Sequence, residues 1–204
     1  MMASFEFDFE KAFAALLYLA SKPNDVPEFD KYKAAKLLFL ADKYHVVRYG
    51  RPILGDSYYA MEYGPIPTKV LDLLKEITGP EARRETTEEV TRLLNSLDID
   101  RRYKYPRLAA KGPVNLDFLS KSDLMALDHV IVVHGRRTFD ELKALTHAMP
   151  AYRKAWDSRP DGTAAPPMSY EDFFDEDSDA IEGAFEEMIE NDMLKNSFLV
   201  NESF

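Results

Sequence analysis

The chain has 204 residues and a formal net charge of −10, from 26 basic and 36 acidic residues. With 46% hydrophobic and 12% aromatic residues, it has the composition of a folded globular protein. It contains no cysteine, which excludes disulfides, thiolate metal sites and a cysteine nucleophile, and its negative charge favours a partner with a basic surface over nucleic acid.

The cellular location is predicted from features that the sequence lacks. No apolar run reaches about 18 to 20 residues, the length that spans a membrane. The acidic, phenylalanine-rich beginning lacks the basic and apolar regions of a signal peptide. We therefore expect a cytoplasmic protein with no membrane contact.

The first third of the chain is predicted to be two helices followed by a strand. Apolar residues recur at helical spacing over residues 8–21, with Asp8 as the N-cap, and prolines at 23 and 27 end this helix. A second helix follows Asp30 and ends near Gly50, a residue suited to a left-handed cap. Over residues 51–63 the period changes to two, which predicts a short strand that Gly64 and Pro65 close.

The next part is predicted to be short helices around one further extended segment. Helices are expected near residues 70–77, 88–97 and 119–133, and after a capping box at Thr138–Glu141. Residues 102–116, which prolines interrupt, are expected to form a broken strand or a hairpin partner for the first strand. This order predicts a mainly α (α+β) fold, in which a compact helical domain carries a small antiparallel β-element.

A change of composition divides the chain near residue 158. Residues 158–168 are rich in Pro, Gly, Ala and Thr, which is typical of a linker or an exposed loop. Residues 169–194 contain eleven acidic and no basic residues around the apolar stripe of Ile181, Phe185, Met188 and Ile189, which predicts an acidic amphipathic helix. We therefore expect a domain over residues 1–157, a linker over 158–168 and a C-terminal acidic amphipathic helix over 169–204.

The sequence carries no recognisable catalytic or metal-binding pattern. No two of the four histidines have the spacing of a helical zinc site, and glycine-rich nucleotide loops and a G-x-S-x-G nucleophile motif are absent. Acidic pairs such as Asp98 and Asp100 are expected on solvated surfaces in a chain with 36 carboxylates. We predict no catalytic residue, no metal and no cofactor; an enzyme with a dispersed carboxylate or histidine site is the alternative.

Two clusters of aromatic and basic residues are candidates for binding. Tyrosines gather between residues 44 and 63, and the sequence leaves open whether they form an interface or part of the core. A basic strip fits a single-stranded nucleic-acid groove, the charged face of an edge strand, or a surface neutralised by the acidic helix of the same or a second copy. The strip consists of Arg101, Arg102, Lys104, Arg107 and Lys111, with Tyr103 and Tyr105 between them.

An ordered series of motifs resembles a known family. A helix with the sequence KLLFLAD precedes a YGRP turn, a GD-x-Y-x-A strand and a GP exit, and further motifs follow as far as Trp156. The residues are Lys36–Asp42, His45, Arg48–Pro52, Gly55, Asp56, Tyr58, Ala60, Gly64, Pro65, Leu119, Ser120, Asp123, Gly135, Glu141, Leu142, Leu145–His147, Pro150 and Trp156. Over about residues 8–157 this series is similar to the Panacea domain, the module of SocA-like antitoxins and related phage-encoded proteins.

The resemblance implies a mainly helical domain with a small β-element that acts as an antitoxin by binding its cognate protein toxin directly. It also implies a second mode, in which the antitoxin is an adaptor that delivers the toxin to the ClpXP protease. A regulator that binds nucleic acid through the basic strip is the alternative of another class. Within the motifs we predict partner binding by six residues: Arg48, Tyr49, Arg51, Tyr58, Tyr59 and Tyr63.

Most other motif residues are predicted to be structural. The leucines at positions 37, 38 and 40 are expected in the core, and the glycines at 50, 55 and 64 at special backbone positions. Asp56 is expected to cap a turn. His147 and Trp156 are expected to form a partly buried pair whose polar groups are satisfied.

Overall fold

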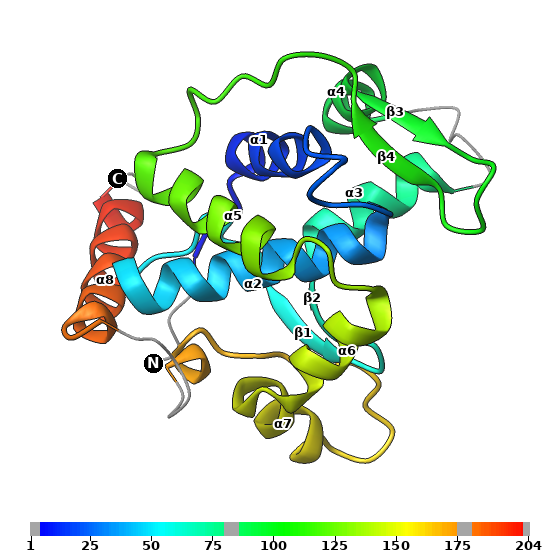
Figure 1. Cartoon of the computed structure of the whole chain (residues 1–204). Helices are drawn as coiled ribbons and strands as arrows, with labels where there is room; N and C mark the ends of the chain where they lie inside the picture. Colours follow the sequence, from blue (N-terminus) through cyan, green and yellow to red (C-terminus); the bar gives the residue numbers. More distant parts are fainter. Residues whose placement is uncertain (1–4, 80–85, 175–180, 202–204) are drawn as a thin grey trace.

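Helix α2 (Lys31–Tyr49) lies at the centre of the fold, and the other elements pack around it (Figure 1). The computed structural model describes residues 5–79, 86–174 and 181–201, which contain eight α-helices, one 3-10 helix and two antiparallel two-stranded sheets. Asp30 caps the beginning of α2 through the N–H groups of Tyr32 and Lys33, and Gly50 ends it at a φ of 61°. The predicted mainly α fold with a small antiparallel β-element is confirmed.

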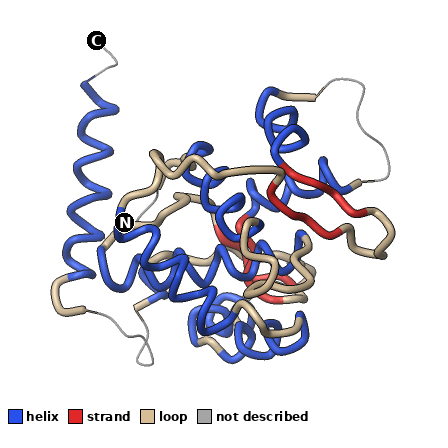
Figure 2. Tube along the Cα trace, turned by 45° about the horizontal axis from the view of Figure 1, so that its top comes forward, coloured by secondary structure: helices blue, strands red, loops and turns tan. Residues whose placement is uncertain are grey.

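The elements follow one another in a simple order. Helix α1 (Phe9–Ala20) precedes α2, and the hairpin of β1 (Tyr58–Met61) and β2 (Gly64–Pro67) follows it. Next come α3 (Thr68–Thr78), α4 (Glu88–Ser96) and a second hairpin, β3 (Leu97–Asp100) with β4 (Arg107–Ala110). Then follow α5 (Lys121–His134), α6 (Phe139–Ala148), α7 (Pro150–Asp157), the 3-10 helix η1 (Glu171–Phe173) and α8 (Ala184–Asn201). Two views show that α8 and the β3–β4 hairpin lie at opposite ends of the molecule (Figures 1 and 2).

One hydrophobic cluster forms the main core and includes residues from α1, α2, α5 and the C-terminal segment. The expected core leucines at positions 37, 38 and 40 belong to it. Because neighbours cover α2 on almost every side, the helix also buries the polar side chains of Lys36, Asp42 and His45. Burial of such groups costs free energy of folding unless they form hydrogen bonds or ion pairs. The partners of these three side chains therefore stabilise the centre of the protein.

The strand pairing differs from the prediction. The strand expected over residues 51–63 has only four residues, and its partner is β2, which follows it directly, rather than residues 102–116. Met61 pairs with Gly64, whose φ of 100° suits glycine at the end of a tight turn. The prolines of β2 are tolerated because a two-stranded sheet needs hydrogen bonds on one side of each strand only. Residues 102–116 contribute β4, which pairs with β3.

Capping side chains explain where several helices begin. Thr138 forms the expected capping box with Glu141 at the start of α6, and Ser120 forms a second one with Asp123 at the start of α5. Asp56 does more than cap a turn: its carboxylate accepts the N–H groups of Lys69 and Val70 at the start of α3. Helix α7, which begins with proline at its first position, was not predicted.

The C-terminal part differs from the prediction at its beginning. The acidic helix begins at Ala184, not at Ser169, and residues 175–180 lie outside the described residues. Tyr170 and Phe173 instead enter the main core, where the Phe173 ring contacts Phe39 with 5.6 Å between centroids. Aromatic burial therefore holds this segment against the body in place of a longer helix.

The end of the expected linker is also attached to the body. The N–H of Ala60 donates to the carbonyl of Pro166, and the N–H of Met168 donates to the carbonyl of Tyr58, both at 2.9 Å. These bonds satisfy the edge of β1 that β2 leaves open. Residues 166–168 therefore act as part of the folded domain.

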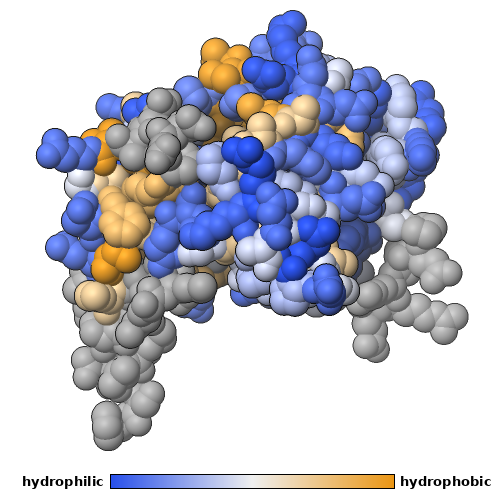
Figure 3. Space-filling model, turned by 90° about the horizontal axis from the view of Figure 1, so that it is seen from below, coloured by the Kyte–Doolittle hydropathy of each residue, from blue (hydrophilic) through white to orange (hydrophobic). Residues whose placement is uncertain are grey.

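Helix α8 leaves apolar surface uncovered. Apolar side chains gather on the lower face at the end where α8 lies (Figure 3), and Ile181, Phe185 and Met193 are exposed. None of the described helices is long and apolar enough to cross a membrane.

Candidate partner-binding site

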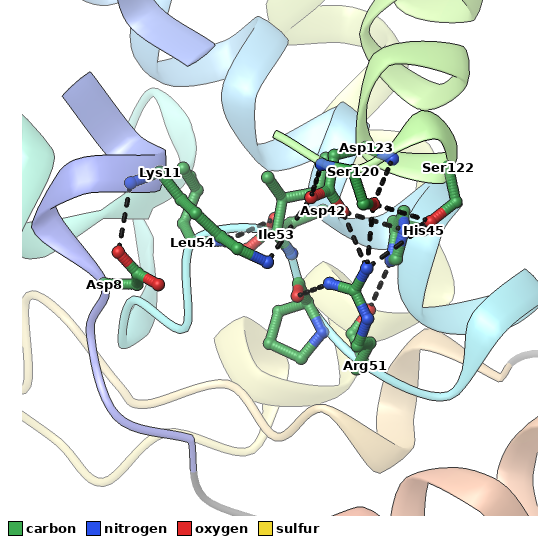
Figure 4. Close-up of polar contacts among 11 residues, drawn as sticks. Asp8, Lys11, Asp42, His45, Arg51, Ile53, Leu54, Ser120, Ser122 and Asp123 are labelled. Carbon is green, nitrogen blue, oxygen red and sulfur yellow. Dashed lines mark hydrogen bonds and ion pairs between the residues drawn. The ribbon is translucent and has the colours of Figure 1, made fainter. Parts of the chain in front are cut away.

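Four polar motif residues, His45, Arg51, Ser120 and Asp123, meet in one largely buried network between α1, α2 and α5 (Figure 4). Asp123, in the first turn of α5, is fully buried and contacts three basic side chains. Its carboxylate lies 3.3 Å from Nζ of Lys11, 3.1 Å from Nε2 of His45 and 3.0 Å from Nη2 of Arg51. A single carboxylate thus joins two helices and the loop after α2 to the start of α5.

The surroundings of Asp123 keep it ionised. Burial alone would raise the pKa of this carboxyl, because it penalises the charged form. The hydrogen bonds from His45 and from the N–H of Ser120, together with the charges of Arg51 and Lys11, outweigh burial and hold the pKa well below its usual range. Asp123 is therefore an anion around which the cations are fixed.

Asp42 is a second fully buried carboxylate, and it organises the loop between α2 and β1. Its oxygens accept the N–H groups of Ile53 (2.7 Å) and Leu54 (3.0 Å) and the hydroxyl of Tyr58 (2.7 Å). Burial raises the pKa of Asp42 to about 6, and these hydrogen bonds counteract only part of that shift. The aspartate of the KLLFLAD motif thus fixes the loop that follows YGRP.

Ser122, His45 and Asp123 are close together but lack the arrangement of a hydrolase triad. In such a triad the serine and the aspartate contact different ring nitrogens of the histidine. Here Nε2 of His45 lies 3.0 Å from Oγ of Ser122 and 3.1 Å from Asp123, while Nδ1 donates to the carbonyl of Arg51 at 2.7 Å. This arrangement orients the ring but provides no proton relay to the serine.

A buried lysine connects α2 to the GP motif. Nζ of Lys36 donates to the carbonyl of Pro65 at 3.0 Å, and a Cβ at position 64 would lie 2.6 Å from that nitrogen. The positive φ favours glycine at position 64, and a larger residue would also displace the Lys36 ammonium group. Burial, with a smaller effect from the charge of Lys143, lowers the pKa of Lys36 to about 7.

Two of the six residues predicted to bind a partner belong to this buried framework. Tyr58 is buried with its hydroxyl on Asp42, and Arg51 is bound to Asp123. Sequence reasoning could not separate these roles, because tyrosine and arginine are enriched at interfaces and also serve in buried networks. Tyr58 is therefore not available on the surface of this structure.

The other four predicted residues are partly or fully accessible. Arg48 lies over the ring of Tyr44, and Tyr49 packs on the ring of His45. Tyr59 is half-buried beside Pro167. Tyr63 is in the turn between β1 and β2 and exposes 48% of its surface, the largest value among the six.

Helix α8 covers the YGRP motif. A Cβ at position 50 would lie 2.7 Å from the backbone nitrogen of Met188 and 2.9 Å from the carbonyl oxygen of Ala184. Nδ2 of Asn191 also donates to the carbonyl of Gly50 at 3.3 Å. The close approach of α8 to the end of α2 therefore depends on the absence of a side chain at Gly50.

Tyr63 belongs to a continuous row of aromatic rings that we call the aromatic ledge: Tyr63, Phe139, Tyr32 and Tyr105. The ring centroids lie 6.2 Å apart for Tyr63 and Phe139, 6.0 Å for Phe139 and Tyr32, and 5.1 Å for Tyr32 and Tyr105. The row connects the β1–β2 turn, α6, α2 and the loop between β3 and β4. Sequence reasoning selected Tyr63 and Tyr105 in separate clusters and missed Tyr32 and Phe139, which lie in distant helices.

The cations of the basic strip are mostly bound within the chain. Arg101 donates to the carbonyls of Ile77, Thr78 and Gly79 at the end of α3. Arg102 pairs with Asp100, Arg107 pairs with Glu28, and Lys111 donates to the carbonyl of Leu94. Because α8 lies at the opposite end of the molecule (Figure 1), it does not neutralise the strip of its own chain.

A groove of about 290 Å³ opens beside Tyr105. It is lined by Glu28, Asp30, Lys33, Tyr103, Lys104, Tyr105, Arg107, Thr138 and Phe139. The groove thus continues the aromatic ledge between the β3–β4 loop and the beginnings of α2 and α6.

The expected pairing of His147 with Trp156 is indirect. Tyr152 lies between the two rings, 4.5 Å from the centroid of His147 and 5.8 Å from that of Trp156. Nε2 of His147 is buried and has no hydrogen-bond partner among the described residues, while the ring also forms a hydrogen bond with the backbone of Glu62, so the side chain is satisfied only in part. The described residues also contain no group of three or more His, Asp or Glu side chains suited to a metal ion.

Comparison with known proteins identifies one family. The family model for the Antitoxin SocA-like, Panacea domain matches residues 35–153, more than half of the chain. The match extends from α2 to α7 and includes Asp42, His45, Arg51 and Asp123, whereas α1 and α8 lie outside it. Neither curated proteins nor solved structures gave a match.

Proposed function

The chain belongs to the family of SocA-like antitoxins with a Panacea domain, and on this basis we propose that it neutralises a cognate protein toxin by binding it directly. The family match over residues 35–153 is the observation that carries the proposal. The polar motif residues within this range hold the helices together. We therefore propose that the chain acts by binding and carries out no chemistry of its own.

The charge of the chain supports a particular kind of partner. At a net charge of −10, long-range attraction favours a toxin with a basic surface and repels nucleic acid. Helix α8 and the residues just before it contribute exposed acidic side chains, including Glu182, Glu186, Glu187 and Glu190. We propose that the two proteins meet in the cytoplasm.

Co-expression tests the proposal. The protein encoded by the gene adjacent to that of this chain is expressed alone and together with this chain in a bacterial host. We expect growth arrest with the neighbouring protein alone, growth with both, and a stable complex in size-exclusion chromatography. A neighbouring protein that is harmless alone, or that still arrests growth when bound in a stable complex, contradicts the antitoxin proposal.

Helix α8 gives a specific reason to test the adaptor mode as well. It lies outside the family match, runs along one side of the body (Figure 2) and, with the residues before it, exposes Ile181, Phe185 and Met193. In an adaptor, such an element would contact the ClpXP protease while the Panacea domain holds the toxin. Purified chain should then accelerate degradation of the toxin by ClpXP, and removal of residues 181–204 should abolish the acceleration but not toxin binding. No acceleration by the full chain leaves masking as the mechanism.

A further inference from the structure

We propose that the toxin docks on the aromatic ledge and places an acidic segment with apolar side chains against the lysines that flank it. This inference rests on the proposed function and adds the contact surface and the chemistry of the segment that fits it.

The ledge provides the apolar part of the surface. Tyr63 and Tyr105 expose 48% and 42% of their surfaces, and Tyr103 at the adjacent groove exposes 43%. Tyr32 and Phe139 lie between them and are half-buried, so they support the exposed rings. Tyrosine dominates many protein interfaces because its ring buries a large area while its hydroxyl tolerates water.

Lysines accompany the rings of the ledge. Nζ of Lys143 lies 4.8 Å from the ring centroid of Tyr63, and Nζ of Lys31 and Lys104 lie 5.2 Å from those of Tyr32 and Tyr105. None of these lysines forms an ion pair with a described residue. Their charges are therefore available to carboxylates of a partner.

Three of the nearby carboxylates already have partners within the chain. Glu28 pairs with Arg107 at 2.8 Å, and Asp30 accepts two N–H groups at the start of α2. Glu141 accepts the N–H of Thr138 at 2.7 Å. The lysines of the ledge thus have no ion-pair partner among the described residues, although the exposed carboxylates of Glu62 and Asp140 adjoin Tyr63 and Phe139 in the chain. A complementary partner segment carries negative charge at this place, even if the toxin as a whole is basic.

Nucleic acid is the other class of ligand that combines negative charge with flat rings, and the geometry favours it less. Bases stack on the faces of aromatic side chains. Here the rings of Tyr32 and Tyr105 meet edge to face at 89°, and lysines lie over the rings of Tyr32, Tyr63 and Tyr105. Arg101, Arg102 and Lys111, which would track a phosphate backbone, are bound within the chain.

The test uses the full chain and the purified product of the adjacent gene, with affinity measured by calorimetry at low and at physiological salt. One variant truncates the exposed rings, Tyr63→Ala with Tyr105→Ala, and a second reverses two charges, Lys104→Glu with Lys143→Glu. Lys121→Glu is the matched control, because Lys121 is exposed at the start of α5 and forms no ion pair with a described residue. Thermal melting verifies that every variant is folded.

We expect each ledge variant to bind at least about ten-fold more weakly than the wild type, since such substitutions remove interface anchors. Lys121→Glu should bind like the wild type at both salt concentrations. Unchanged affinity of both folded ledge variants overturns the inference and leaves the antitoxin proposal intact. If the wild-type chain neither binds nor rescues, the antitoxin proposal itself fails.

A separate arm tests the competing ligand class. A 20-nucleotide single-stranded DNA and an RNA of equal length are titrated against the wild type and the charge-reversed variant at low salt. The inference predicts no binding by either oligonucleotide. Binding that the Lys104→Glu and Lys143→Glu changes abolish would assign the ledge to nucleic acid and overturn the inference.

Discussion

The carboxylate of Asp123 lies 3.0 Å from the guanidinium of Arg51, although 72 residues separate them in the chain. The same carboxylate holds His45 and Lys11, and it caps α5 together with Ser120. The YGRP turn and the later S-x-x-D motif are therefore two halves of one structural unit. The sequence does not indicate this relationship, because each motif taken alone predicts only a local cap or turn.

Asp123→Asn should strongly destabilise the fold. Loss of this charge leaves Lys11 and Arg51 without their shared anion, and removal of one partner from a buried ion pair costs about 3 to 5 kcal/mol. Urea unfolding at pH 7 measures the loss. Asp100→Asn is the control, because the pair of Asp100 with Arg102 is on the surface and should change the midpoint little. Equal effects of the two changes would contradict the central role of Asp123.

The direction of its pKa shift determines how the contribution of Asp123 to stability depends on pH. The pKa of Asp123 is lower in the folded than in the unfolded chain, where it is near 3.8. The stabilisation is therefore complete above the unfolded pKa and is lost as pH falls through the folded pKa. The difference in stability between wild type and Asp123→Asn should shrink below about pH 4; a constant difference from pH 7 to pH 3 contradicts this assignment.

Lys36→Met should remove a rise in the free energy of unfolding that the wild type shows as pH increases above 7. The pKa of Lys36 is about 7 in the folded chain and near 10.5 in the unfolded chain, so between these values the unfolded chain binds the extra proton. Wild-type stability should gain up to about 1.4 kcal/mol per pH unit from this group as pH rises from 7 towards 10. Unfolding at pH 7, 8 and 9 compares the slopes. A Lys31→Met control, at a half-buried position, should retain the wild-type slope.

Gly50→Ala should loosen α8 while the rest of the protein stays folded. The left-handed backbone costs a non-glycine residue about 1 to 2 kcal/mol, and the new methyl group would meet the backbone of α8 at 2.7 to 2.9 Å. Relative to the wild type, the variant should show a larger increase in amide hydrogen exchange in residues 184–191 than in α2. Gly112→Ala, which meets no atom within 4 Å, is the matched control. Unchanged protection of α8 would show that it does not depend on this approach.

The sequence was sufficient to predict the central helices, because the residues that cap a helix lie next to it in the chain. Helix α2 begins after Asp30 and ends at Gly50, as the capping residues alone predict. Strand pairing is not local: residues 102–116 were expected to be either a broken strand or the partner of β1, but the adjacent residues 64–67 form that partner. Tyr170 and Phe173 were assigned to an acidic helix because the surrounding charge dominates the pattern, whereas their burial depends on a core formed by distant residues.

The candidate site shows the same division. The exposed side chains of Tyr63 and Tyr105 were both noticed, but as members of unrelated clusters. Their connection through Phe139 and Tyr32 exists only once α2 and α6 are packed together. A tyrosine in the sequence gives no sign of its depth: Tyr58 and Tyr63 lie only five residues apart, yet the first is buried and the second is exposed.

Tyr58→Phe should destabilise the protein more at pH 7.5 than at pH 4. The Tyr58 hydroxyl donates to the buried carboxylate of Asp42, whose pKa is about 6 in the folded chain and near 3.8 in the unfolded chain. Because the folded pKa is raised, ionisation of Asp42 reduces stability as pH rises from about 4 to about 6, and the hydroxyl limits this loss. A hydrogen bond to a charged group contributes about 1.5 to 3 kcal/mol, so the variant should lose roughly that amount at pH 7.5 and less at pH 4.

Urea unfolding of Tyr58→Phe and Tyr59→Phe at both pH values separates this effect from a loss of packing. Tyr59 is the neighbouring residue of β1 and is half-buried, so its hydroxyl has little influence on Asp42. The Tyr59 variant should therefore show a small change that is the same at both pH values. If Tyr58→Phe is equally destabilising at pH 4 and pH 7.5, the hydroxyl does not serve the ionised form of Asp42. The loop that joins YGRP to β1 would then be held by the N–H groups of Ile53 and Leu54 alone.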